Sequence, residues 1–239
     1  MTTLGQIVGR PREAVPGFWW RVLSPLGAVL LAFVILVAGA GVLSLTAMSD
    51  SSLEAILVSA TSLLLLLFAL VLWRGLPPAN RRAAVAVKGR PGTAVLTGVL
   101  IGMALVVGAG LILLAGSAID PNVERRLNEV ESIGTVPWQV TLTVISLVVL
   151  APLGEELLFR GLLLRGLARR MPFWPAALIS AVLFASAHAD SYVLWPRAIA
   201  LVGTGVVLAA IYRWRGYWCS VSAHATVNTV AAIALIASS

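Results

Sequence analysis

The chain alternates long apolar stretches with short polar ones, and this pattern predicts helices that cross a membrane. A helix needs about 20 apolar residues to span the hydrocarbon core, and stretches of about that length recur from end to end. We therefore expect an all-α, polytopic transmembrane helical bundle with seven or eight spans. The seven that the pattern defines are residues 25–48, 53–73, 93–119, 138–167, 173–188, 194–212 and 217–236.

The composition supports lipid as the main solvent. Hydrophobic residues make up 59% of the chain and charged residues only 11%, whereas a soluble domain carries about 25% charged residues. A disordered chain is excluded, because such chains are poor in apolar residues. A water-soluble globule has no means of hiding so much apolar surface, so we expect an integral membrane protein.

The charges predict the orientation of the spans. The net charge is +7, but Lys and Arg occur in short runs between apolar stretches and form no patch on a polar domain, so a nucleic acid is not an expected partner. With the N-terminus inside, all of the 17 basic residues except Arg125, Arg126 and Arg197 fall on the inner side or on the spans' inner halves. The positive-inside rule then predicts a cytoplasmic N-terminus and an outer C-terminus.

Two further features concern packing. Cys219 is the only cysteine, which excludes an intrachain disulfide and a cysteine-based metal cluster. Gly98 and Gly102 form a GxxxG pair, which allows the third span to pack closely against a neighbour, and packing within the fold is favoured over homodimerisation. We divide the chain into residues 1–136, which hold N-terminal helices and loops, and residues 137–239, which hold the polar motifs, within one integral membrane unit.

Ionisable residues inside apolar spans are costly and are functional candidates by default. The fourth expected span contains an EExxxR pattern, the fifth ends in FxxxH, and the seventh contains HxxxN. The two histidines of these patterns are the only ones in the chain. The residues concerned are Glu155, Glu156, Arg160, Phe184, His188, His224 and Asn228.

The helical period predicts the helix face on which each of these side chains lies. Glu156 and Arg160 are four residues apart and therefore pair on one helix face. Glu155 is rotated by about 100° from Glu156 and is expected to project into the bundle. If the three helix faces converge, one carboxylate, two imidazoles and an amide meet in a low-dielectric cavity.

Such a set suits two kinds of hydrolysis. The carboxylate of Glu155 can act as a general base on water, with Asn228 and either histidine donating to a developing oxyanion. Alternatively, Glu155, His188 and His224 can bind zinc with an open fourth position for water. The chain contains no HExxH helix that would impose the metal, so no cofactor is favoured and zinc is the alternative.

Each feature also has a purely structural interpretation. Glu156 and Arg160 can be a structural ion pair, and Glu155 can make an interhelical hydrogen bond. His188 can be an interfacial histidine, and the His224–Asn228 pair can join helices, as polar residues do in membranes. The coincidence of three such patterns on three separate helices favours function.

The ordered series EExxxR, FxxxH and HxxxN resembles the CPBP (CAAX protease and bacteriocin-processing) intramembrane proteases, which include the type II CAAX prenyl endopeptidases. The resemblance covers about residues 138–236, and the preceding part of the chain carries no motif of the family. It implies an all-helical membrane endopeptidase with its site inside the bundle.

The resemblance also implies roles for the motif residues. Glu155 would be the base that activates water, with His188 beside it, while His224 and Asn228 would stabilise the oxyanion. Metal-free hydrolysis is favoured over a zinc mechanism. The remaining motif residues would support the site: Glu156, Arg160 and Phe184.

The sequence therefore predicts an intramembrane endopeptidase that acts on a membrane-associated peptide or protein, with a CAAX-like tail as one such substrate. Its expected partners are membrane lipid and this peptide or protein substrate. A catalytically idle membrane scaffold is the alternative from another class. A small transporter that uses Glu155 and the histidines as a proton relay is disfavoured, because the spans show no inverted halves.

Overall fold

The computed structural model describes residues 18–43, 49–128, 136–188, 192 and 194–237. Within these residues the structure is helical, apart from turns, short connections and one isolated antiparallel bridge between Val87 and Gly216. Arg10 and Arg12, on which the orientation prediction partly rests, lie outside the described residues. The predicted all-α helical bundle is confirmed.

The N-terminal part contains three long helices and two short ones. Their bounds are α1 Phe18–Leu43, α2 Asp50–Arg74, α3 Pro78–Ala84, α4 Pro91–Ile119 and α5 Pro121–Asn128. The Ser49 side chain caps α2 by accepting from the Ser52 amide, and prolines stand in the first turns of α3 and α4. A proline in the first turn costs nothing there, because its missing N–H would have no helical partner.

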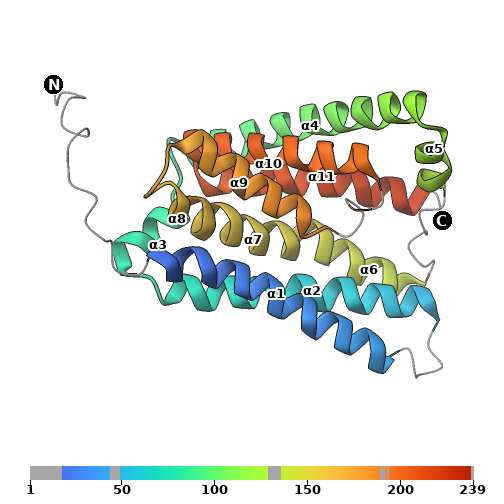
Figure 1. Cartoon of the computed structure of the whole chain (residues 1–239), viewed down its shortest axis with the longest axis horizontal. Helices are drawn as coiled ribbons and strands as arrows, with labels where there is room; N and C mark the ends of the chain where they lie inside the picture. The colour runs from blue at the N-terminus through green and yellow to red at the C-terminus, as the bar shows by residue number, and fades with distance from the viewer. Residues whose placement is uncertain (1–17, 44–48, 129–135, 189–191, 193, 238–239) are drawn as a thin grey trace.

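The motif-bearing part begins with one continuous helix over residues 137–167 that contains two π-helical segments. It comprises α6 (Pro137–Ile145), the π-helical segment η2 (Ser146–Leu150), α7 (Ala151–Glu155), a second π-helical segment η3 (Glu156–Leu164) and α8 (Arg165–Leu167). Three helices follow, α9 (Phe173–Ser186), α10 (Trp195–Arg215) and α11 (Tyr217–Ala237). Figure 1 shows the continuous helix in the middle of the bundle, with α1 and α2 on one side and α4, α9, α10 and α11 on the other.

Among the described residues, six helices are long and apolar enough to cross a membrane, one fewer than the seven expected spans: α1, α2, α4, the continuous helix over residues 137–167, α10 and α11. The fifth expected span is shorter than the others, because α9 has only 14 residues. At 1.5 Å per residue it extends about 21 Å, which is less than the thickness of the hydrocarbon core, about 30 Å. It ends at Ser186, two residues before His188.

The outer surface of the bundle is apolar. Leu30 is 64% exposed, Val71 67% and Leu114 68%, on three different helices. A soluble protein rarely leaves a continuous apolar surface of this kind in contact with water. The exposure of these side chains is that of an integral membrane protein, in which lipid covers them.

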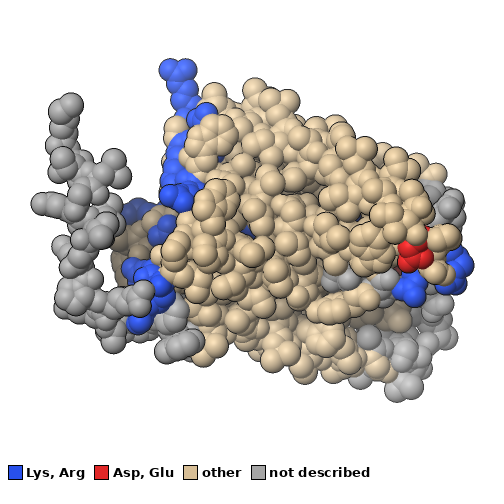
Figure 2. Space-filling model, turned by 45° about the horizontal axis from the view of Figure 1, so that its top comes forward, with Lys and Arg blue, Asp and Glu red and all other residues tan. Residues whose placement is uncertain are grey.

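The basic residues gather at one end of the bundle, which we call the basic end. Figure 2 shows Lys and Arg concentrated there, while the opposite end carries an acidic group and a few basic ones. The connection before α4 and the turn between α10 and α11 meet at the basic end, where the Lys88 amide donates to the Arg215 carbonyl at 3.0 Å. The basic end includes Lys88, Arg213 and Arg215, because the Lys88 ammonium also donates to the Arg213 carbonyl at 2.5 Å.

Glycines allow two helices without motifs, α2 and α4, to approach the helices that carry the motifs. A Cβ on Gly102 of α4 would lie 2.6 Å from the Ala223 carbonyl oxygen of α11, and Gly98 faces the same helix one turn away. The predicted GxxxG contact is therefore made within the fold. A Cβ on Gly154 would lie 2.8 Å from the Leu66 amide nitrogen, so α2 and α7 also approach each other at backbone distance.

Candidate active site

The two adjacent glutamates point in different directions. Glu156 Oε1 lies 2.7 Å from Arg160 Nη1, and both side chains are fully buried. Glu155 instead lies beside a cavity with 13% of its side chain exposed. The predicted division is thus present, with Glu156 paired to Arg160 and Glu155 projecting inward.

The helix changes its winding between these two residues. Glu155 is the last residue of α7, and Glu156 is the first residue of the π-helical segment η3. π-Helical segments are rare and occur frequently at functional sites. The change of winding redirects the side chains that follow Glu155, and it is a local feature that the 3.6-residue periodicity did not predict.

Glu156 is held by donors from three side chains. Besides Arg160, His224 Nδ1 lies 3.0 Å from Oε1, and the Ser220 hydroxyl donates to Oε2. Arg160 Nη2 donates in turn to the Gly205 carbonyl at 3.2 Å. Glu156 and Arg160 therefore join the continuous helix to α10 and α11.

His224 lies between the two glutamates. Because the acceptor at Nδ1 is the Glu156 carboxylate, we assign the hydrogen of the neutral ring to Nδ1. The lone pair at Nε2 then faces Glu155, whose Oε2 lies 3.9 Å away. That Oε2 atom is buried and has no hydrogen-bond partner among the described residues.

A cavity of about 790 Å³ brings three of the predicted catalytic residues together: Glu155, His188 and Asn228. His224 contributes through its contact with Glu155 behind the cavity wall. A volume of this size lies within the range of ligand-binding pockets.

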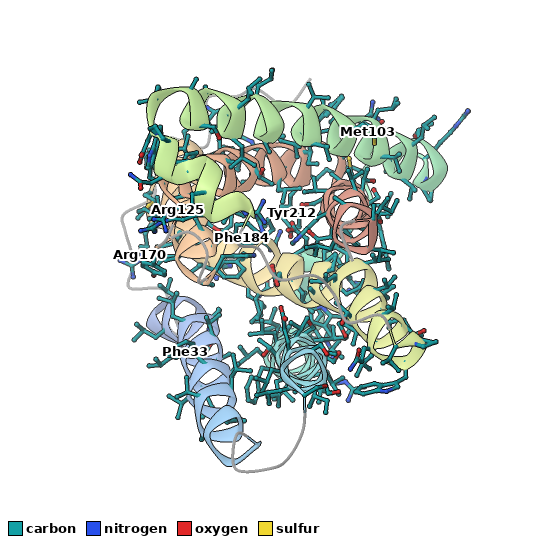
Figure 3. The ribbon with its side chains drawn as sticks, turned by 90° about the vertical axis from the view of Figure 1, so that its right-hand side faces the viewer. Phe33, Met103, Arg125, Arg170, Phe184 and Tyr212 are labelled. Atoms are coloured by element: carbon teal, nitrogen blue, oxygen red, sulfur yellow. The ribbon has the colours of Figure 1, made fainter. Side chains whose placement is uncertain are left out.

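Phe184 packs against both histidines. Its buried ring lies 4.8 Å from the His188 ring and 5.7 Å from the His224 ring, centroid to centroid, and the Arg160 guanidinium lies 4.5 Å from its centroid. Figure 3 shows Phe184 in the interior of the bundle, whereas Phe33 lies on the outer side of α1. The supporting position predicted for Phe184 places it in contact with three other motif residues.

His188 and Asn228 each hold a backbone carbonyl. His188 Nδ1 lies 2.9 Å from the Phe184 carbonyl oxygen, which also accepts from the Ala187 amide at 3.2 Å at the end of α9. Asn228 Nδ2 donates to the Leu147 carbonyl of η2 at 2.8 Å. The amide nitrogen of Asn228 carries a second hydrogen for use in the cavity.

Sequence reasoning missed Ser220. Its hydroxyl lies within hydrogen-bond distance of both the Glu156 carboxylate and the Leu208 carbonyl. Ser220 precedes His224 by four residues, as His224 precedes Asn228, so all three lie on one face of α11. That spacing was the available signal.

The described residues contain no group of three or more His, Cys, Asp or Glu side chains arranged to hold a metal ion. The alternative zinc ligands Glu155, His188 and His224 therefore do not form such a group.

Comparisons with known proteins agree with the motifs. Residues 137–230 match the family described as type II CAAX prenyl endopeptidase Rce1-like. An Escherichia coli protein described as an uncharacterized 24.3 kDa protein is 37% identical over 93 residues, which are 38% of this chain and 42% of that protein. No solved structure matches the chain. The resemblance inferred from the three motifs is confirmed over residues 137–230, the part of the chain that matches this family.

Proposed function

We propose that the protein is an intramembrane endopeptidase that hydrolyses a peptide bond by water activated at Glu155. The observation that carries the proposal is the buried Oε2 of Glu155, which has no hydrogen-bond partner among the described residues and lies beside a cavity, 3.9 Å from His224 Nε2. A buried polar atom normally has a hydrogen-bond partner. An open acceptor at a cavity is what a general base for an incoming water requires.

The geometry accommodates one water on both groups. Hydrogen bonds of about 2.8 Å allow a single oxygen to reach two atoms that are 3.9 Å apart. Such a water donates one hydrogen to Glu155 Oε2 and the other to the lone pair of His224 Nε2. Its own lone pair is then directed at a substrate carbonyl in the cavity.

The reaction follows in two steps. Glu155 takes a proton from the water while the new C–O bond forms at the carbonyl carbon, and the oxyanion accepts the second N–H of Asn228. His224 accepts the second hydrogen of the attacking oxygen at Nε2 and holds that oxygen beside Glu155 while the C–O bond forms. The carboxyl group of Glu155 then passes its proton to the leaving nitrogen as the C–N bond breaks, which restores the carboxylate.

His188 and the buried Glu156–Arg160 pair have supporting roles in these steps. His188 lines the cavity beside Glu155 and orients the substrate. Glu156 and Arg160 act as positioning residues, because Glu156 holds His224 through Nδ1. Hydrolysis in this scheme uses no metal.

The proposed setting is a bacterial plasma membrane with the basic end on the cytoplasmic side. The support is the gathering of Lys and Arg at one end of the bundle (Figure 2) and the positive-inside rule. The substrate is a membrane-associated peptide or protein, and a CAAX-like tail is one substrate to test.

The deciding experiment compares Glu155→Gln with the wild-type protein on a library of quenched apolar peptides in detergent. We expect the isosteric amide to lower kcat by about 10²–10⁴-fold, the usual contribution of a general base, with thermal unfolding unchanged. Asp120→Asn is the matched control, because the Asp120 carboxylate accepts from Asn122 at the surface, away from the cavity. Wild-type turnover that persists in Glu155→Gln would refute the assignment, and a folded wild-type protein that cleaves no peptide would favour a scaffold.

A further inference from the structure

The cavity beside Glu155 has two unlike walls. One is formed by the family segment and carries Glu155, His188 and Asn228. The other is formed by α1 and α2, which lie outside residues 137–230. We call it the α1–α2 wall, and it consists of Val29, Leu36, Leu53, Glu54, Leu57, Val58, Thr61, Ser62 and Leu65.

The α2 part of this wall is a single helix face. Positions 54, 57, 58, 61, 62 and 65 follow the spacing that places residues on one side of an α-helix. From Leu53 to Leu65 the wall covers 12 residue steps, which is about 18 Å of helix. The wall is buried at Leu65 and exposed at Glu54, so the cavity closes toward Leu65 and opens toward the start of α2.

The hydroxyl groups in this wall are already engaged. Thr61 Oγ1 donates to the Leu57 carbonyl at 2.7 Å, and Ser62 Oγ donates to the Val58 carbonyl at 2.9 Å. Each hydroxyl hydrogen is therefore engaged within α2. From Leu57 to Leu65 the α1–α2 wall offers shape and apolar contact, while the polar groups for chemistry come from the family segment.

We propose that the α1–α2 wall is the specificity subsite of the protease and binds an apolar peptide segment in extended conformation. This inference rests on the proposed function. An extended chain advances at most about 3.3–3.6 Å per residue, so the wall matches about five residues. A helical segment fits the chemistry less well, because each carbonyl inside a helix is engaged in a backbone hydrogen bond.

Leu57 is the position that tests selection by size. We would measure kcat/KM for quenched peptides that differ only in one apolar side chain, Ala, Leu or Phe, at each position in turn. Leu57→Ala enlarges the subsite, so we expect it to shift the Phe-to-Ala ratio of kcat/KM by about tenfold or more at one position, the size of effect that a few methylenes give in an apolar pocket. The matched control is Leu63→Ala on the same helix, whose side chain is 46% exposed on the outer surface, and its ratio should equal that of the wild type.

A binding measurement separates this inference from the proposed function. An apolar peptide that carries a diazirine side chain is photocrosslinked to the full-length Glu155→Gln protein, and the crosslinked residues are mapped by mass spectrometry. We expect labels on α2 between Leu53 and Leu65. Labels confined to residues 137–237, together with unchanged kcat/KM ratios in Leu57→Ala, would overturn the subsite even if the protein is a peptidase. Labels on α2, together with a wild-type protein that cleaves no peptide, would support the subsite and refute the proposed function.

Discussion

His224 Nε2 lies 3.9 Å from Glu155 Oε2, while the other ring nitrogen of His224 contacts the neighbouring glutamate. One imidazole therefore links a buried ion pair to the carboxylate that faces the cavity. In the proposed mechanism, Glu156 is therefore a positioning group and Glu155 the reactive one.

This relationship predicts the behaviour of His224→Gln. The substitution removes the ring nitrogen that holds the attacking water beside Glu155, so we expect kcat to fall by about 10²-fold, the cost of misplacing a reacting group, with KM nearly unchanged. Steady-state kinetics on a peptide that the wild type cleaves gives both constants. A variant that loses affinity but keeps kcat would assign His224 to substrate binding.

The buried pair predicts a coupled effect on stability. Arg160→Met leaves the Glu156 charge buried without its partner, and such a loss costs about 3–5 kcal/mol. Adding Glu156→Gln removes that charge, so the double variant should be more stable than Arg160→Met alone. Unfolding of the four proteins in detergent forms a double-mutant cycle, and strictly additive effects would contradict the pairing.

Ser220 predicts a smaller effect of the same kind. Ser220→Ala removes one hydrogen bond to Glu156, which lowers the free energy of unfolding by about 1–3 kcal/mol because the acceptor is charged. The control is Ser186→Ala, since the exposed Ser186 hydroxyl donates only within its own helix. If Ser220 positions the site through Glu156, its variant should also lower kcat, whereas the control should change neither quantity.

The contact between α4 and α11 predicts a difference between two glycines of one helix. Gly102→Ala places a Cβ 2.6 Å from the Ala223 carbonyl oxygen, and such overpacking costs about 1–3 kcal/mol. Gly108 has nothing within 4 Å of an added Cβ, so Gly108→Ala should stabilise the helix by about 0.5–1 kcal/mol. Thermal unfolding tests both variants. Equal melting temperatures for Gly102→Ala and Gly108→Ala would show that the GxxxG face does not pack against α11.

The proposed chemistry predicts insensitivity to metal removal. Turnover of the purified protein should persist in EDTA and in 1,10-phenanthroline, and its metal content should be substoichiometric. Zinc at one equivalent whose removal abolishes turnover, and whose return restores it, would replace the glutamate mechanism with the zinc alternative.

The sequence predicted the features that repeat along a helix. The apolar stretches located the helices, and the four-residue spacing of Glu156 and Arg160 predicted their ion pair, because both depend on local geometry alone. The shortness of α9 did not follow from hydropathy, since Ala187 and its neighbours extend the apolar stretch past Ser186.

Features made between helices were harder to predict. The approach of Ser220 to Glu156 joins positions 64 residues apart, and the α1–α2 wall joins helices that carry no motif to the motif residues. Both depend on how helices pack, and a single sequence does not encode that packing in any periodic pattern. The catalytic roles of the motif residues stay predictions for the experiments above.

The contact of Gly98 and Gly102 with α11 has a consequence for how far the motif segment can be moved between proteins. Ser220, His224 and Asn228 share one face of α11, and rotating the helix by a single residue would turn all three by about 100°. Part of what prevents that rotation is α4, a helix that the family match does not include. Grafting residues 137–230 alone into another membrane protein would transfer every motif and omit a surface that keeps the motif residues facing one another.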